Sequence, residues 1–506
     1  MTVGDEAGTA ITTGDENVFM GFNAGRSVAT GSGNVAIGNE SLHTEDGNGK
    51  NVAIGLQSLY TLNAGADAHN TAVGYQSGKL VTTGVENTLV GGLAGDALTT
   101  SNANVAVGKS ALSAETSSNG NTAIGAESLK NQNVGGSGDA RNTAVGLLAG
   151  TNVSTGIQNT LIGALAGDAF TDADFNVAVG CKALGADTLG SRSVAIGRSA
   201  LTAQNFTSAT EVYNVAVGFA AGEALTNGER NVFIGGDTAK GATTPDDCVI
   251  IGFEAGSGAT LTGHDNTYVG VRAGKVTTSG QKNTFIGRDA GTAVTTGTGN
   301  TLIGLGTGAA TNDISGETPL TTGTNNVLVG QKCQTGAANS DSQVVLGFEC
   351  IGASNSSLTF GKSATDSNID MGATSITAPS DERYKENITT STAGLSFIND
   401  LRPVTYRWKM EKDVPTNSRS YKSGSETRVM ECGNKIMHGF IAQEVKAVID
   451  NHSEIKDGFR MWSETNNFDN RQRVAPGELI PVLTKAVQEL STALDAALAR
   501  ITTLEG

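Results

Sequence analysis

The sequence contains few of the residues on which ordinary globular domains depend. Its 506 residues include 7 prolines, 5 cysteines and 2 tryptophans, and aromatic residues make up only 5%. The cysteines form no CxxC pair, which argues against a disulfide scaffold or a thiolate metal site and predicts free, buried thiols. No stretch approaches the roughly 18 apolar residues of a membrane-spanning helix, so we expect no membrane insertion. The first residues include no basic and apolar signal region, so we expect synthesis in a cytosol.

Basic residues are scarce before residue 380. The net charge is −15 over residues 1–379 and −1 over residues 380–506. Without a basic stripe to neutralise phosphates, the first part is not expected to bind nucleic acid. The same part contains 61 of the 68 glycines, whereas both tryptophans lie in the second part. The chain therefore joins two different kinds of sequence, and "APSDERYKENI" (378–388) marks the boundary.

A short motif recurs throughout the glycine-rich part. Its units read like "NVAIG" (51–55) and "NTLIG" (159–163), and their closing glycines define 20 units between residues 17 and 361. Of the 19 spacings between these glycines, 13 are 17 residues, and the exceptions are mostly insertions. A fixed period with occasional insertions predicts a solenoid whose outer loops absorb the extra residues.

Each unit has the pattern of a β-strand that is buried on both faces. The second position is Val or Thr in all units but the last, the fourth is always aliphatic, Met or Phe, and the third is apolar in 19 of 20 units. One face can pack inside the chain's own coil, but the other face needs a second surface. A symmetric copy of the chain is the simplest such surface, so we expect a homotrimer of side-by-side or interwound solenoids.

Asparagine opens 16 of the 20 units, and glycine closes all of them. Asparagine at a corner hydrogen-bonds the backbone, tolerates the left-handed conformation and stacks along the axis, while glycine permits a tight turn. We therefore predict a mainly β fold, a parallel β-roll or β-helix solenoid over 17–361, with a short segment (1–16) before it and a linker (362–379) after it. The scattered histidines and carboxylates of the repeats show no metal or catalytic spacing, so no cofactor, metal or activity on external substrates is predicted.

Residues 380–506 have the pattern of a small α+β domain. Residues 402–409 alternate like a strand, residues 439–449 have helical spacing, and residues 476–505 begin with Pro-Gly and continue as a long helix. Apolar residues in this helix recur at alternating steps of three and four, which predicts a parallel coiled coil over about 478–505. The seam consists of Leu483, Val487, Leu490, Leu494, Ala497, Ile501 and Leu504. A coiled coil at this position would hold chain ends together during assembly.

Both parts of the sequence resemble known families. The repeats, as in "SVAIGRSAL" (193–201), resemble the heads of trimeric autotransporter adhesins such as YadA. The motifs "SDERYKENI" (380–388), "LRPVTYRWK" (401–409), "HGFIAQEV" (438–445) and "ELIPVLTKAVQEL" (478–490) resemble, in this order, the intramolecular chaperone domain of phage endosialidases, many tail fibres and spikes, and myelin regulatory factor. The resemblance implies that residues 380–506 trimerise, guide folding of the preceding β-rich part and then cut themselves off.

The same resemblance implies that Ser380 and Lys385 are catalytic and that the Pro379–Ser380 bond is cut. A hydroxyl is a weak nucleophile that needs a neighbouring base, and a lysine amine is a base only when it is neutral. Burial or nearby positive charge favours the neutral amine, so packing of Lys385 in a trimer would couple cleavage to assembly. His438 is a candidate for a competing base or an orienting partner, with a purely structural role as the alternative. The oxyanion donors are not identified.

The sequence therefore predicts a phage-type tail fibre or spike of the virion, with a trimeric shaft and a removable chaperone. Expected partners are copies of the chain, a host cell-surface receptor (a glycan or an outer-membrane component) and other tail-fibre proteins. Insertions such as residues 305–325 are candidate receptor-binding loops. Two alternatives remain: a cell-surface adhesin built on the same solenoid, and a surface-polysaccharide hydrolase, which would need converging carboxylates.

Overall fold

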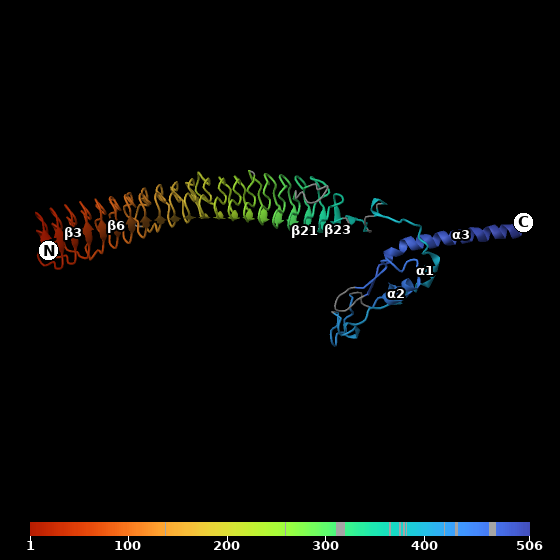
Figure 1. Cartoon of the computed structure of the whole chain (residues 1–506). Helices are drawn as coiled ribbons and strands as arrows, with labels where there is room; N and C mark the ends of the chain where they lie inside the picture. The colour runs from red at the N-terminus through yellow and green to blue at the C-terminus, as the bar shows by residue number, and fades with distance from the viewer. Residues whose placement is uncertain are drawn as a thin grey trace. The chain divides into compact units, whose positions relative to one another are not determined.

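The computed structural model divides the chain into two compact units, Met1–Pro379 and Ser380–Gly506. Figure 1 shows a long stack of short strands joined by loops in the first unit, and a mixture of helices and short strands in the second. The structure describes residues 1–505 apart from positions 137, 259, 310–318, 364, 365, 374, 375, 378, 379, 381, 419, 431–433 and 465–471. No helix among these residues is long and apolar enough to cross a membrane.

The first unit is a β-solenoid whose turns stack in one 22-stranded sheet. Successive strands pair in parallel, and only the last pair, β23–β24, is antiparallel. The strands are β1 (Thr2–Val3), β2 (Val18–Met20), β3 (Val35–Ile37), β4 (Val52–Ile54), β5 (Thr71–Val73), β6 (Thr88–Val90), β7 (Val105–Val107), β8 (Thr122–Ile124), β9 (Thr143–Val145), β10 (Thr160–Ile162), β11 (Val177–Val179), β13 (Val194–Ile196), β15 (Val215–Val217), β16 (Val232–Ile234), β17 (Val249–Ile251), β18 (Thr267–Val269), β19 (Thr284–Ile286), β20 (Thr301–Ile303), β21 (Val327–Gln331), β22 (Val344–Phe348), β23 (Ser357–Lys362) and β24 (Ser367–Asp370). A separate parallel pair, β12 (Gly190–Ser191) and β14 (Thr210–Glu211), forms a small sheet of its own.

Equivalent positions of successive units pair with each other, so side chains of one kind stack along the solenoid. Leu161 pairs with Ala178, for example, and both are fully buried in the core. The ladder also includes β1, which pairs with β2. The solenoid therefore begins within the segment 1–16 that was expected to precede it. Thr2 takes the third position of this unit, which is apolar in 19 of the 20 other units, so the motif is not apparent there.

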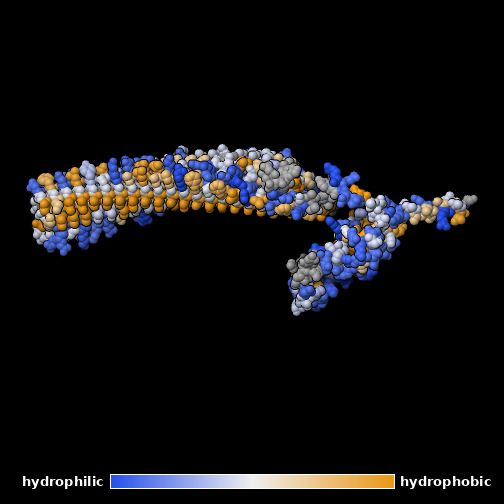
Figure 2. Space-filling model, in the orientation of Figure 1, coloured by the Kyte–Doolittle hydropathy of each residue, from blue (hydrophilic) through white to orange (hydrophobic). Residues whose placement is uncertain are grey.

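The outward-facing strand positions form a continuous apolar stripe. Residues at the fourth position, such as Met20, Ile162 and Ile286, are 38–40% exposed. Figure 2 shows this stripe running along the solenoid. The prediction of strands with two apolar faces is confirmed, and a single chain covers only the inner face.

The asparagines form a ladder inside one corner of the solenoid, as predicted. The backbone N–H of Asn176 donates to Asn159 Oδ1 at 2.9 Å, and Asn159 Nδ2 donates to the carbonyl of Ala173 at 2.7 Å. The left-handed conformation, however, belongs to the preceding residue and not to the asparagine. Gln158 and Phe175 have φ values of 55° and 60°. The asparagine must keep its amide inside the corner, so the residue before it makes the turn and carries an exposed side chain.

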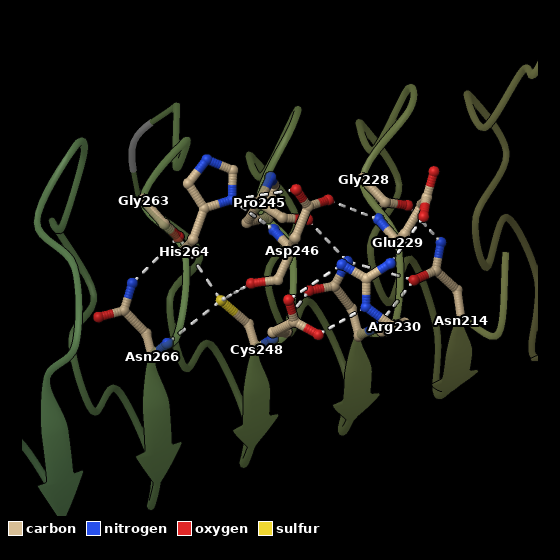
Figure 3. Close-up of polar contacts among 12 residues, drawn as sticks. Asn214, Gly228, Glu229, Arg230, Pro245, Asp246, Cys248, Gly263, His264 and Asn266 are labelled. Carbon is tan, nitrogen blue, oxygen red and sulfur yellow. Dashed lines mark hydrogen bonds and ion pairs between the residues drawn. The ribbon is translucent and has the colours of Figure 1, made fainter.

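Cys248 occupies an asparagine position of this ladder, and Figure 3 shows its surroundings. The N–H of Asn266 donates to Cys248 Sγ at 3.4 Å, and the thiol donates to the carbonyl of Gly263 at 3.5 Å, so sulfur makes longer versions of both asparagine contacts. Burial raises the pKa of the Cys248 thiol to about 11, which keeps its proton available for donation. Free, buried thiols were predicted for all five cysteines, and Cys248, Cys333 and Cys350 are free and buried in the structure. Cys181 is exposed because it follows a closing glycine on the outer surface, and position 432 lies outside the described residues.

Removing one amide from the ladder is expected to weaken the solenoid strongly. Asn159→Ala leaves the N–H of Asn176 and the carbonyl of Ala173 buried without these partners, which costs about 2–6 kcal/mol at about 1–3 kcal/mol for each group. A urea titration of the free energy of unfolding measures this loss. Asn152→Ala is the control, because Asn152 is exposed and its loss is expected to cost about 0.5 kcal/mol or less. Equal losses of unfolding free energy in the two variants would contradict the conclusion that the buried asparagine ladder stabilises the solenoid.

The second unit is built around three helices. Its elements are η2 (Glu382–Tyr384), α1 (Leu395–Asp400), β25 (Val404–Tyr406), η3 (Glu411–Asp413), β26 (Met437–Gly439), α2 (Ala442–Asn451), β27 (Trp462–Glu464), β28 (Gln472–Val474), η4 (Pro476–Glu478) and α3 (Leu479–Glu505). The antiparallel pairs β25–β26 and β27–β28 form two small sheets. Phe397 of α1, Val445 of α2 and Leu479 of α3 meet in one core. The predicted strand, middle helix and long terminal helix are all present.

Candidate autoprocessing site

The first residues of the second unit bring Ser380 and Lys385 together. The short 3-10 helix η2 lies between them, and the N–H of Lys385 donates to the carbonyl of Glu382 at 3.0 Å. Because a 3-10 helix completes a turn in three residues, it returns the lysine side chain towards the serine. Lys385 Nζ donates a hydrogen bond to Ser380 Oγ at 2.7 Å. This distance is short enough for direct proton transfer between the two groups.

Both side chains of the pair are exposed in the single chain. The amine is the donor in this hydrogen bond, whereas a general base must accept the hydroxyl proton through its lone pair. The arrangement therefore has the distance of a Ser–Lys dyad but not the enclosed surroundings that favour a neutral amine. A surface that covers these two exposed side chains would supply the enclosed surroundings that the pair lacks in the single chain. The geometry is therefore compatible with cleavage that begins only after assembly.

The other residues assigned to the site from the sequence lie elsewhere or outside the described part. Position 379, the residue before the expected scissile bond, is not among the described residues. His438 is exposed in β26, opposite Thr405 of β25, and not at the start of a helix, because α2 begins at Ala442. Within the described part of the chain, no hydrogen bond or ion pair joins His438 to Ser380 or Lys385.

Glu489 is a residue whose role the sequence did not reveal. Its carboxylate, on α3, accepts the backbone N–H of Leu395 at 2.8 Å, and so satisfies a free donor at the first turn of α1. Lys485 lies 3.8 Å from the same carboxylate. This contact ties the start of the domain to the long helix. Nothing in the sequence distinguishes Glu489 from the other charged residues on that helix.

Beyond this contact, α3 leaves the core. Only Leu479, Val482 and Ala486 of the helix are buried. The apolar seam along the helix is exposed, from 43% for Leu483 to 85% for Leu504. A seam of this length without a partner within the chain is typical of a helix that associates with other helices.

His452, at the end of α2, joins two helices electrostatically. Its Nδ1 lies 2.8 Å from Glu454 Oε1, and its Nε2 lies 2.9 Å from Asp400 Oδ2 at the end of α1. The ring packs edge-on against Phe397, with 5.3 Å between the centroids. Hydrogen bonds to Glu454 and Asp400 raise the pKa of His452 above its ordinary value of 6.5. The protonated ring therefore bridges two carboxylates in a nearly buried position.

This bridge predicts that the second unit loses stability at alkaline pH. Because the pKa of His452 is higher in the folded state than in the unfolded state, protonation of the ring stabilises the fold. This stabilisation is complete below pH 6.5 and is lost as the pH rises through the folded-state pKa. Each pH unit by which folding raises this pKa adds about 1.4 kcal/mol to the free energy of unfolding. Tryptophan fluorescence reports on this unit alone, because Trp408 and Trp462 are the only two tryptophans. Thermal melts between pH 6 and pH 9 should show a decline that His452→Asn abolishes.

His438→Asn is the matched control for this pH dependence. His438 is an exposed histidine of the same unit, so its variant should retain the wild-type decline. A decline that survives in His452→Asn, or disappears in His438→Asn, would show that another group is responsible.

Together, the fold and this pair define a class of protein: a long parallel β-solenoid followed by a small α+β domain with a serine and a lysine in contact at its first residues. Residues 380–454 match the model of the family described as chaperone of endosialidase. No curated protein and no solved structure matches the chain. A solenoid with such a chaperone domain is the architecture of phage-type tail spikes and fibres, and this chain has it. The match ends before α3.

Proposed function

We propose that the protein is a homotrimeric tail fibre or spike that attaches a phage virion to its host, and that residues 380–506 are a chaperone which trimerises, aligns the solenoids and then cuts itself off. Identical repeats can pair in many registers, so three solenoids align slowly by themselves. A trimer formed first at one end fixes the register and raises the effective concentration of the repeats. Removal of the chaperone afterwards leaves a fibre that is held kinetically.

Two exposed apolar surfaces support the trimer. The stripe on the solenoid and the seam on α3 are far longer than the scattered apolar residues of a monomer surface. Each surface presents apolar side chains at regular intervals along the solenoid or the helix. Copies of the chain that run in the same direction therefore bring matching apolar residues together at every turn. The receptor would be a surface glycan or an outer-membrane component, bound through exposed loops of the solenoid.

The proposed cleavage uses the two groups that the structure brings together. Ser380 Oγ attacks the carbonyl carbon of residue 379 while Lys385 Nζ accepts the hydroxyl proton. The lysine then returns the proton to the backbone nitrogen of Ser380, which leaves as the C–N bond breaks, and an ester joins residue 379 to Ser380 Oγ. Water hydrolyses this ester, which yields a new carboxylate at residue 379 and restores the hydroxyl. Covering of Lys385 by a neighbouring copy would favour the neutral amine that this sequence of steps needs.

The observation that carries the proposal is the 2.7 Å contact between Lys385 and Ser380 in a segment that matches the chaperone family. Denaturing electrophoresis of the recombinant chain tests it. The wild type is expected to yield a fragment of about 379 residues, whereas Ser380→Ala and Lys385→Arg stay intact, because alanine has no nucleophile and arginine does not release its proton.

Ser391→Ala is the control for this experiment, since Ser391 is an exposed serine that follows the pair closely in the sequence. It should be cut like the wild type. Light scattering shows whether each variant is trimeric. Full-length wild-type chains in proven trimers would overturn the cleavage, and cleaved monomers would overturn its dependence on assembly.

A further inference from the structure

The second unit contains a cleft that the cleavage does not use. It has a volume of about 820 Å³, and residues of β25, β26, β28 and the segment 414–430 line it. Among the described residues that line it, Arg407, Lys409 and Arg473 are positively charged, and His438 is also part of the lining. None of the described residues that line it is an aspartate or glutamate. We call this feature the basic cleft.

No described residue neutralises the cations of the basic cleft. The side chains of Arg407, Lys409 and Arg473 make no hydrogen bond or ion pair with any described residue. Outside the cleft, by contrast, Arg402 pairs with Glu444. Unpaired positive charges along a concave surface create a local potential that attracts anionic groups.

The basic cleft also offers apolar contacts and free strand edges. Tyr406 and Trp408 stand edge to face, with 5.6 Å between their centroids, and Trp408 is 36% exposed. The sheets that contribute to the lining have only two strands each, so each has unpaired edges. Aromatic side chains, cations and strand edges together suit an extended, acidic peptide that contains apolar residues.

We propose that the basic cleft binds acidic stretches of solenoid sequence before they fold. This inference rests on the proposed chaperone function and identifies the surface that would perform it. The solenoid is the acidic partner that the chain always supplies, because residues 1–379 carry a net charge of −15. Attachment in the same chain also makes its effective concentration high.

One stretch shows why folding would release the bound segment. Residues 167–180 ("GDAFTDADFNVAVG") contain three aspartates and no basic residue. In the folded solenoid Phe170 and Ala178 are fully buried, and β11 is paired on both sides. The buried apolar groups and the backbone donors of this stretch are therefore available to the basic cleft only before the turn forms. Folding withdraws them, so binding would not trap the product.

Fluorescence polarisation of a labelled 167–180 peptide tests the proposal. The full-length Ser380→Ala chain is used so that the second unit stays attached whatever happens at the cleavage site. We expect saturable binding that weakens as salt rises, and at least tenfold weaker binding of the same peptide with its three aspartates changed to asparagine. The double variant Arg407→Glu/Arg473→Glu should likewise lose at least tenfold in affinity for the acidic peptide.

A matched variant separates the cleft from net charge. Lys456 and Arg460 are exposed cations of the same unit that do not line the cleft, so Lys456→Glu/Arg460→Glu should bind within twofold of the parent. Equal binding of both peptides, equal effects of both double variants, or no binding to a proven trimer would overturn the proposal. So would binding of a sulfated polysaccharide at the cleft in place of the peptide. These failures leave trimerisation and cleavage untouched, because electrophoresis and light scattering test those separately.

Discussion

Gly91→Ala is expected to destabilise the solenoid by about 3 kcal/mol or more, although it adds a single methyl group. Gly91 closes the turn after β6 with φ +138°, a conformation that is essentially restricted to glycine. A Cβ atom there would lie 2.4 Å from the carbonyl oxygen of Gly108 in the next turn. Backbone strain and the clash add together, because neither turn can move without breaking its ladder. Urea titrations give the free energy of unfolding.

The neighbouring residue provides the control for this prediction. Gly92 has no positive φ, and the nearest atom to an added Cβ is the carbonyl oxygen of Tyr75 at 4.0 Å. Gly92→Ala should therefore change stability by about 0.5 kcal/mol or less. If the two alanine variants are equally stable, the closing glycines are a feature of composition and not a requirement of the turn.

The sequence predicted the solenoid because its period repeats the same physical demand in every turn. The closing glycine and the inner apolar residue can each be read from one unit and checked against the others. The asparagine was harder, because asparagine suits both a buried ladder and a left-handed corner. The structure gives it the first role and leaves the left-handed conformation to residues such as Phe175 and Arg192. Their side chains vary from turn to turn, so they carried no signal.

Three buried carboxylates were not predictable from the sequence. Glu45, Glu115 and Asp187 are fully buried, and each precedes a turn that is lengthened by insertion. The best satisfied of them, Glu115, accepts three successive backbone N–H groups, including that of Ser118, and a side-chain hydrogen bond from Gln132 of the next turn. These carboxylates fill polar positions that the longer turns create. In the sequence they look like any acidic residue of an acidic surface.

The candidate site was predictable in part, and for a different reason. The assignment of Ser380 and Lys385 came from a resemblance, and the structure adds that η2 brings the two side chains within 2.7 Å. Whether they cleave the chain stays a prediction. The bridge made by His452 could not be found from the sequence, because Asp400 lies on a different helix and only the fold brings it near.

Ile196→Lys is expected to keep the solenoids from associating once the second unit has been cut off, while leaving each solenoid folded. Ile196 is the last residue of β13 and the fourth of its repeat unit, is 39% exposed on the apolar stripe, and lies between Val179 and Val217 in the ladder. Its side chain points away from the chain's own core, so circular dichroism should show unchanged β-structure. Threefold symmetry would place three lysines in one interface, and each buried, unpaired ammonium costs several kcal/mol. Light scattering of the cleaved product should then report the mass of a single solenoid.

Leu80→Lys is the control for this prediction. Leu80 is 45% exposed, slightly more than Ile196, but it lies in a turn and not on the stripe. Loss of apolar surface alone would affect both variants similarly, whereas a trimer packed on the stripe is disrupted only by Ile196→Lys. Trimers of the cleaved product that persist in Ile196→Lys, with unchanged β-structure, would show that the solenoids are held together without contact between the strand faces. The stripe would then have to face a different partner, because so long an apolar surface is not expected to stay open to water.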